Sequence, residues 1–255
     1  MSTPSNPLVL REDAVAVATL TLNRPDRANA LSEAMIDALG ERIAEAAADP
    51  AVRVVVLAAN GKIFCAGHDL REMSGREGKA HFEALFARCS RMMLAIRSCP
   101  KPVIAKVQGA AVAAGCQLVA TCDLAYAADT ARFGVSGINL GLFCSTPSVA
   151  LSRAIPRKQA LDLLLTGRLI GAERAAEIGL INAAVPAAEL DQVTAETAEM
   201  LAAKLPPATA LGKELFYRQL EMNLADAYAL AGERMAENMG FADTRALVDG
   251  FSKAS

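Results

Sequence analysis

Residues 103–122 read VIAKVQGAAVAAGCQLVATC, so a short apolar strand is followed by a glycine turn, a loop of small residues and a helix. The same order occurs earlier in the chain, where the apolar run Val52–Leu57 leads through Asn60-Gly61 into the small-residue loop Ala66-Gly67-His68. Nearly continuous apolar runs are typical of strands that are covered on both faces. The repetition therefore predicts an α/β core.

Strands are predicted mainly in the first part of the chain, and the last quarter is almost entirely helical. Apolar side chains four residues apart predict a helix that begins near Ser32 and ends before Asp49-Pro50. The other predicted elements are strands over 15–22 and 124–127 and helices over 81–96, 147–154, 157–165, 172–178, 187–204 and 208–238, with Pro206-Pro207 between the last two. We expect a core domain over residues 1–190 and a helical C-terminal region over residues 191–255.

Composition excludes several classes of function. The 255 residues include 26 Lys and Arg against 28 Asp and Glu, which provides no basic surface for nucleic acid. No stretch approaches the roughly 20 apolar residues of a membrane-spanning helix, and residues 1–14 lack the apolar run of a signal peptide. The six cysteines form no C-x-x-C pair and only two histidines are present, so we expect no metal site and buried free thiols in a cytoplasmic protein.

The two small-residue loops, Ala66-Gly67-His68 and Ala113-Ala114-Gly115, are the first candidates for a functional site. Each follows a buried strand, so the two loops are expected to meet at one crevice. Backbone N–H groups at the start of a helix lack partners within the helix, and small side chains let a ligand approach them. Two such groups directed at one carbonyl oxygen would stabilise negative charge on it, although glycine in such loops also serves turn geometry alone.

Several motifs, in this order, resemble the crotonase (enoyl-CoA hydratase/isomerase) superfamily, and the similarity runs from about residue 8 to Lys253. They are Asn23–Leu31, Phe64–Leu70, Gly109–Cys116 and Leu165-Thr166-Gly167 with Ala175–Leu180. The resemblance implies a crotonase (ClpP-like) spiral of β-β-α repeats with a helical C-terminal trimerisation extension. It also implies an acyl-CoA thioester as substrate, no separate cofactor, and a homo-oligomer that is a trimer or a dimer of trimers.

Site residues follow from the resemblance position by position. The thioester oxygen would lie between the backbone N–H groups of His68 and Ala114, and Arg27 would face the CoA phosphates. Contacts to CoA are implied for Ala66, Gly67, Asp69 and Leu70, and for Phe251 and Lys253 in the site of a neighbouring subunit. The acyl group would lie near Gly115, Gly137, Asn139, Cys144 and Ser145.

The sequence departs from the superfamily where hydratases carry two catalytic glutamates. Gln117 stands at the first of these positions and Gly137 at the second, and neither residue can act as a general base. The aspartate that a dienoyl-CoA isomerase uses corresponds to Ser145. His68 is the best remaining candidate, because an ordinary imidazole pKa near 6.5 suits proton transfer. The alternative is that His68 only shapes the pocket.

Three functions therefore remain open. The resemblance favours reversible addition of water across the 2,3 double bond of a 2-enoyl-CoA. A second possibility keeps the two N–H donors and uses His68 for isomerisation, decarboxylation or thioester hydrolysis. The third is an acyl-CoA-binding protein without catalysis. Cys144 as a nucleophile and Asn139 as a water-orienting residue are further candidates, with plain packing as the alternative for each.

Overall fold

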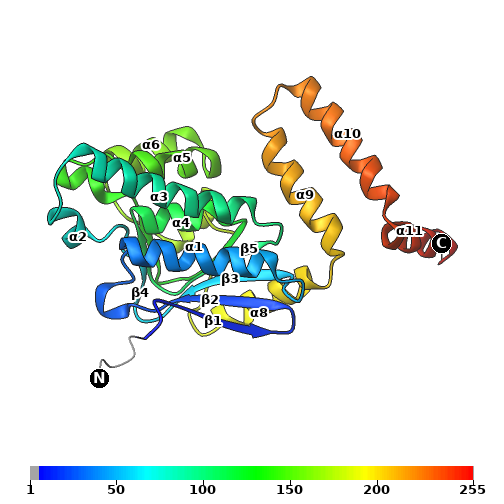
Figure 1. The fold of residues 1–255 in the computed structure, drawn as a ribbon, viewed down its shortest axis with the longest axis horizontal. Helices are drawn as coiled ribbons and strands as arrows, with labels where there is room; N and C mark the ends of the chain where they lie inside the picture. The colour runs from blue at the N-terminus through cyan, green and yellow to red at the C-terminus, as the bar shows by residue number, and fades with distance from the viewer. Residues whose placement is uncertain (1–5, 255) are drawn as a thin grey trace.

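The computed structural model describes residues 6–254, which form two β-sheets surrounded by helices and a helical arm (Figure 1). The strands are β1 Val9–Ala14, β2 Val17–Leu22, β3 Val54–Ala59, β4 Ile63–Cys65, β5 Val103–Val107, β6 Ala110–Val112, β7 Leu124–Ala128, β8 Arg132–Gly134, β9 Ile170–Gly171 and β10 Ala183–Val185. The core helices are α1 Glu33–Ala48, α2 Leu70–Ser74, α3 Lys79–Ser98, α4 Ala114–Thr121, α5 Ser145–Ala154, α6 Arg157–Thr166, α7 Ala172–Glu177 and α8 Leu190–Ala202. Two 3-10 helices, η1 Pro25–Arg27 and η2 Ser136–Leu140, lie in loops.

Each repeat places one strand in each of the two sheets. The larger sheet has the order β1-β2-β3-β5-β7-β10, and the smaller sheet has the order β4-β6-β8-β9. The successive pairs β3–β4, β5–β6 and β7–β8 therefore occupy neighbouring positions in both sheets, in the same order. Neighbouring strands run parallel, except that β1–β2 and β8–β9 are antiparallel. The strand–loop–helix unit that the sequence predicts twice is thus present three times, and it brings successive loops to one edge.

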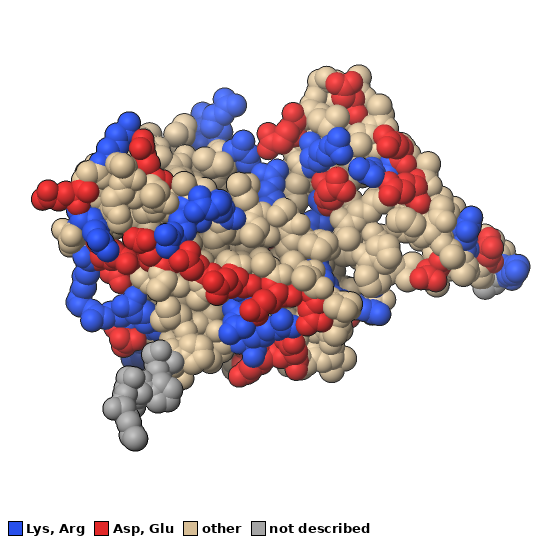
Figure 2. Space-filling view, viewed as in Figure 1, with Lys and Arg blue, Asp and Glu red and all other residues tan. Residues whose placement is uncertain are grey.

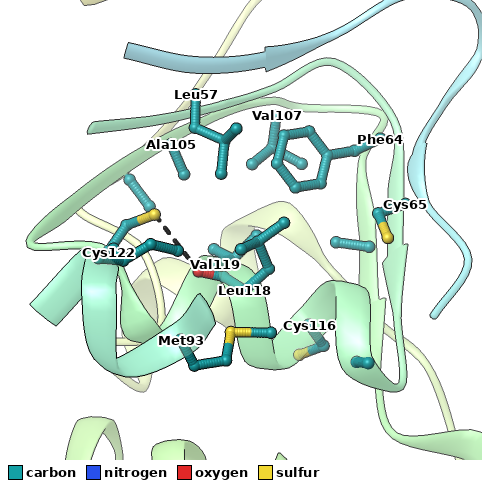
Figure 3. Close-up of a cluster of buried hydrophobic side chains, with 14 of the residues drawn as sticks. Leu57, Phe64, Cys65, Met93, Ala105, Val107, Cys116, Leu118, Val119 and Cys122 are labelled. Carbon is teal, nitrogen blue, oxygen red and sulfur yellow. Dashed lines mark hydrogen bonds between the residues drawn. The ribbon is translucent and has the colours of Figure 1, made fainter. Parts of the chain in front are cut away.

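The start of α4 is fixed by a dense apolar core. Leu118 and Val119 of α4 are almost fully buried and face Leu57 and Val107 of the large sheet (Figure 3). The thiol of Cys122 donates a hydrogen bond to the carbonyl oxygen of Leu118 at 3.3 Å and so closes the end of this helix. A close-packed interior leaves little freedom for the helix, so its N-terminus is held rigidly against the sheets.

The last three helices, α9 Pro206–Gln219, α10 Leu224–Gly240 and α11 Ala242–Ala254, leave the core as an extended arm (Figure 1). Before them, α8 packs against β3, β5 and β7, where Ala198 and Ala202 cover Val54, Val56 and Ile104. The boundary expected at residue 190 falls at the first residue of α8, whereas the chain leaves the sheets only after Ala202.

Two predictions about the helical region are wrong in detail. The helix expected over 208–238 is divided between α9 and α10, because Asn223 caps a new helix by accepting a hydrogen bond from the backbone N–H of Asp226 at 3.0 Å. The break expected at Pro206-Pro207 is present, since α8 ends at Ala202, but the two prolines lie inside the first turn of α9, where proline is tolerated. The predicted elements do not include β1, β10, α2, α11 or any strand of the smaller sheet.

Candidate functional site

A cavity of about 250 Å³ lies between the loop before α2, the start of α4 and the segment that joins η2 to α5. Both small-residue loops of the sequence analysis contribute to it, which confirms that they meet at one crevice. The lining residues are Ala66, His68, Leu70, Met73, Phe86, Ala113, Ala114, Ser136, Gly137, Leu140, Leu142, Phe143, Cys144, Ser145, Thr146 and Pro147. The walls are thus largely apolar, and His68 and Cys144 are the titratable side chains among them.

The loop that carries His68 is held in place by the segment Asn23–Leu31. The backbone N–H of Leu31 donates to the carbonyl oxygen of Gly67 at 2.8 Å, and the N–H of Asp69 returns a bond to Leu31 at 3.2 Å. The fully buried Asn29 side chain donates to the carbonyl oxygens of Asn60 and Ile63 at 2.9 and 2.8 Å. These bonds leave the backbone of His68 between two anchored neighbours.

The loop that carries Ala114 is anchored by an unusual backbone conformation. Ala113 has φ +51° and ψ −117°, a region that non-glycine residues rarely occupy, and its N–H donates to Gly134 at 2.8 Å. Gly115 lies directly against the carbonyl oxygen of Cys65, so no larger residue fits there. The strained residue and the glycine together direct the first turn of α4 toward the His68 loop.

His68 and Ala114 both line this cavity, and neither backbone N–H donates a hydrogen bond to a described residue. The loops approach each other at Gly67, whose φ of +92° favours glycine. A Cβ atom at Gly67 would come within 3.2 Å of the Ala114 nitrogen and 2.9 Å of the Ala113 Cβ. Donors that are fixed in this way stabilise negative charge without reorganising.

Burial changes the chemistry of the His68 imidazole. Desolvation lowers the pKa of His68 from 6.5 to about 4, and the ring lies edge-on to Phe86 with a centroid distance of 5.4 Å. Its Nε2 atom is enclosed and has no hydrogen-bond partner among the described residues, whereas Nδ1 is not enclosed. At neutral pH the ring is therefore uncharged, and its pKa is lower than the ordinary value used in the sequence analysis.

The depressed pKa of His68 predicts a specific loss of stability in acid. Between pH 6.5 and about 4 the unfolded chain binds a proton at this residue that the folded chain does not, so the free energy of unfolding falls as pH falls, by roughly 3 kcal/mol in all. Urea unfolding followed by circular dichroism across this range should show that loss in the wild type and a smaller loss in His68→Gln. Equal losses in both proteins would contradict the assignment.

Cys144 occupies the space next to Gly137. A Cβ atom at Gly137 would lie 2.7 Å from the Cys144 Sγ and 2.6 Å from the carbonyl oxygen of Leu142. A glutamate at this position would therefore require the loop to move. Burial also raises the pKa of the Cys144 thiol, against a weaker opposing effect of a hydrogen bond from the Gly137 N–H, so a nucleophilic thiolate is disfavoured.

The structure does not bring all the predicted site residues to this cavity. Gln117, one turn beyond Ala114, lines a second cavity on the other side of α4. Asn139 is bonded to the carbonyl oxygen of Gly167 at 3.3 Å, and Asp69 caps α2 by accepting from the N–H groups of Arg71 and Glu72. Gly67, Gly115 and Arg27 are likewise absent from the lining residues, whereas Ala66, Leu70, Gly137, Cys144 and Ser145 line the cavity beside His68 and Ala114.

The predicted contacts of Phe251 and Lys253 concern a neighbouring subunit. Both residues lie on α11 at the end of the arm, far from the cavity of their own chain (Figure 1).

Asp69 also forms an ion pair with Arg24 at 3.3 Å, which joins the His68 loop to the segment Asn23–Leu31. Asp69 thus binds backbone amides at the start of α2 and fixes the loop.

Sequence reasoning missed the apolar side chains that form most of the wall. Met73 and Phe86 come from α2 and α3, and only the helical spacing of apolar residues in α3 gave any signal for Phe86. Leu140, Leu142 and Phe143 lie in the glycine-containing segment from 133 to 147, whose composition marks a loop but does not show which side chains turn inward.

Comparison with known proteins identifies the family. Residues 12–250 match the family model described as enoyl-CoA hydratase/isomerase. The chain belongs to the enoyl-CoA hydratase/isomerase family. It is 44% identical over 227 residues to human enoyl-CoA hydratase domain-containing protein 3, mitochondrial, covering 89% of this chain and 75% of the relative. The Xenopus laevis protein of the same name is 44% identical over 237 residues, which cover 93% and 81% of the two chains.

Solved structures confirm the crotonase fold. An enoyl-CoA hydratase from Mycobacterium smegmatis superimposes with a TM-score of 0.96 and is 52% identical, covering 98% of this chain and 97% of that one. Human enoyl-CoA hydratase domain-containing protein 3 superimposes with a TM-score of 0.94 at 40% identity, covering 98% of both chains. The predicted membership of the crotonase superfamily is thus confirmed.

The expected cytoplasmic location is wrong, because the human and Xenopus laevis relatives are named as mitochondrial proteins. The prediction of buried free thiols is confirmed for all six cysteines. Within residues 6–254, no helix is both long and apolar enough to cross a membrane. The same residues contain no cluster of three or more His, Cys, Asp or Glu side chains suited to a metal ion.

Proposed function

We propose that this protein binds acyl-CoA thioesters in the cavity between His68 and Ala114 and adds water to a 2-enoyl-CoA. The unpaired N–H groups of these two residues carry the proposal, since both face one cavity and would hold the thioester oxygen. The apolar wall formed by Met73, Phe86 and Phe143 suits the acyl group. Family membership and the names of the relatives support a thioester substrate.

The proposed reaction needs one proton-transfer group. His68 would accept a proton from water at Nδ1 while the water oxygen bonds to C3 of the enoyl group. The electron pair of the C2–C3 double bond would form a double bond between C1 and C2 while the carbonyl pair moves to the thioester oxygen, where the two N–H groups would stabilise the enolate. Transfer of the same proton from His68 to C2 would complete the addition. A base whose pKa is lowered to about 4 is weak, so we expect slow turnover.

Double-bond isomerisation is the second candidate. His68 is the one imidazole in the cavity, and a glutamate at position 137 would collide with Cys144 and Leu142. Moving a double bond requires removal and return of a single proton, without activation of water. A cavity with one proton-transfer side chain therefore suits this reaction chemically, and the same two N–H donors would serve its enolate.

The test is the loss of enoyl-thioester absorbance when the purified protein is mixed with crotonyl-CoA. We expect measurable turnover in the wild type and at least a hundredfold less in His68→Gln, since general acid–base catalysis contributes roughly 10²–10⁴-fold. Chromatography of products from 3-enoyl-CoA separates hydration from isomerisation. Calorimetric binding of these thioesters without turnover of either would instead support the acyl-CoA-binding alternative.

We also propose that the protein is a homotrimer, or a pair of trimers, assembled through its helical arm. Large apolar side chains are exposed along α10 and α11, including Leu224, Tyr228 and Met235 at more than 70%. Monomeric proteins rarely expose such continuous apolar surface. On the face that Figure 2 shows, acidic and basic side chains lie over the core and also along the arm, between apolar and uncharged residues. Sedimentation should give three or six times the chain mass of 26.7 kDa; a single-chain mass would contradict the proposal.

A further inference from the structure

The cavity between His68 and Ala114 has an open side and a closed end. Leu70, Leu140 and Leu142 line it and are 53%, 70% and 46% exposed, so these side chains form its mouth. Ala114 and Cys144 line the same cavity but are only 0% and 8% exposed, so they belong to its closed end. A ligand that enters through the mouth therefore meets Cys144 at the inner wall.

A bound thioester would lie with its acyl group toward the closed end. CoA is too large for a cavity of about 250 Å³ and carries charged phosphates, and among the described residues no Lys, Arg, Asp or Glu side chain lines this cavity. Burying a charge without a partner is strongly unfavourable. CoA would therefore stay outside the mouth, and the acyl chain would extend from Ala114 toward Cys144.

The thiol of Cys144 fills the space beside Gly137. A Cβ atom at Gly137 would lie 2.7 Å from the Cys144 Sγ, so the sulfur atom occupies the volume that a side chain at position 137 would need. Cys144 precedes the first residue of α5, and its side chain makes no capping hydrogen bond. The size of this side chain can thus be changed without the loss of a helix cap.

We propose that Cys144 sets the length limit of the acyl chain and that the cavity selects short, uncharged aliphatic acyl groups. At roughly 30 Å³ for a group the size of a water molecule or a methylene, a cavity of about 250 Å³ has room for a thioester carbonyl and about four to six further carbons. This inference rests on the proposed function, because it requires the thioester to bind in this cavity.

The experiment is calorimetric titration of the full chain with butanoyl-, hexanoyl-, octanoyl- and decanoyl-CoA, which are saturated and need no turnover. We expect octanoyl- and decanoyl-CoA to bind more weakly than hexanoyl-CoA, by roughly tenfold or more. Cys144→Ala removes an atom about as large as a methylene and should reduce the difference between hexanoyl- and octanoyl-CoA roughly tenfold. Cys144→Met should shift the preference to butanoyl-CoA.

Cys99→Ala is the matched control. Cys99 is only 2% exposed and does not line this cavity, so the same substitution there should leave the chain-length preference unchanged. Thermal unfolding of each variant checks that it is folded. Cys144→Gly is a second variant without the thiol, since glycine is well tolerated immediately before a helix.

The outcomes separate this inference from the proposed function. Equal binding of all four thioesters by the wild type, or an unchanged preference in the Cys144 variants, would overturn the length limit and leave thioester binding intact. The absence of binding by every thioester would overturn both. The expected preference in binding, without turnover of crotonyl-CoA, would support the length limit and contradict only the proposed hydration.

Discussion

Replacing Lys213 with methionine is expected to lower the free energy of unfolding by about 3–5 kcal/mol. Its ammonium group is almost fully buried and donates to the carboxylate of Asp123 at 2.6 Å and to the carbonyl oxygens of Ile96 and Lys101 at 3.1 and 3.0 Å. Methionine fills a similar space but removes the positive charge and all three hydrogen bonds, so the buried Asp123 carboxylate keeps only the bonds from the Val103 N–H and the Tyr217 hydroxyl, both at 2.7 Å. Urea unfolding monitored by circular dichroism gives the change directly.

A double-mutant cycle separates the ion pair from the other bonds of Lys213. Asp123→Asn removes the negative charge, and its single oxygen accepts either from the Tyr217 hydroxyl or from the Val103 N–H, which bond to the two oxygens of Asp123 at 2.7 Å each. The combined variant should be more stable than the sum of the two single losses predicts, by roughly 0.5–3 kcal/mol. Additive losses, or a loss below about 1 kcal/mol for Lys213→Met, would show that this pair does not hold α9 to the core.

The hydrogen bonds of Lys213 could not be predicted from the sequence. Lys213 and Asp123 are 90 residues apart, and neither belongs to a motif whose spacing indicates a partner. The loop pair was predictable for the opposite reason, since each loop follows its own strand in a repeated unit and parallel repeats bring such loops to one edge. Local order along the chain therefore predicts the cavity between the two loops but not the contacts that fix the arm.

The helices show the same distinction. α1 was predictable because Met35, Leu39 and Ile43 define one buried face and Ser32 caps the first turn by accepting from the Met35 N–H at 3.2 Å. The break before α10 was not, since the residues around Asn223 continue to favour helix on composition alone. Gln117 was predicted to belong with Ala114 by its place in a motif, yet it lines a different cavity. Ala114 would act through an N–H at the helix end, which points along the axis, whereas a side chain projects from the flank of the helix.

Ala114→Pro tests the proposed catalytic role of a single N–H group. Proline is tolerated as the first residue of a helix, and Ala113, which precedes it, is outside the α region that proline disfavours. The Ala114 N–H bonds to no described residue, so the fold loses no hydrogen bond. If this group stabilises the enolate, kcat should fall by roughly 10²–10³-fold, or about 3–4 kcal/mol.

The control for Ala114→Pro is Lys79→Pro, at the exposed first residue of α3 and outside the residues that line the cavity. Both variants should unfold within a few degrees of the wild type, while only Ala114→Pro should lose turnover of crotonyl-CoA. Retention of full turnover with an unchanged unfolding temperature would remove the Ala114 N–H from the mechanism. A severe loss of stability would trace instead to the strained Ala113 backbone, and an amide-to-ester replacement at Ala114 would then isolate the missing donor.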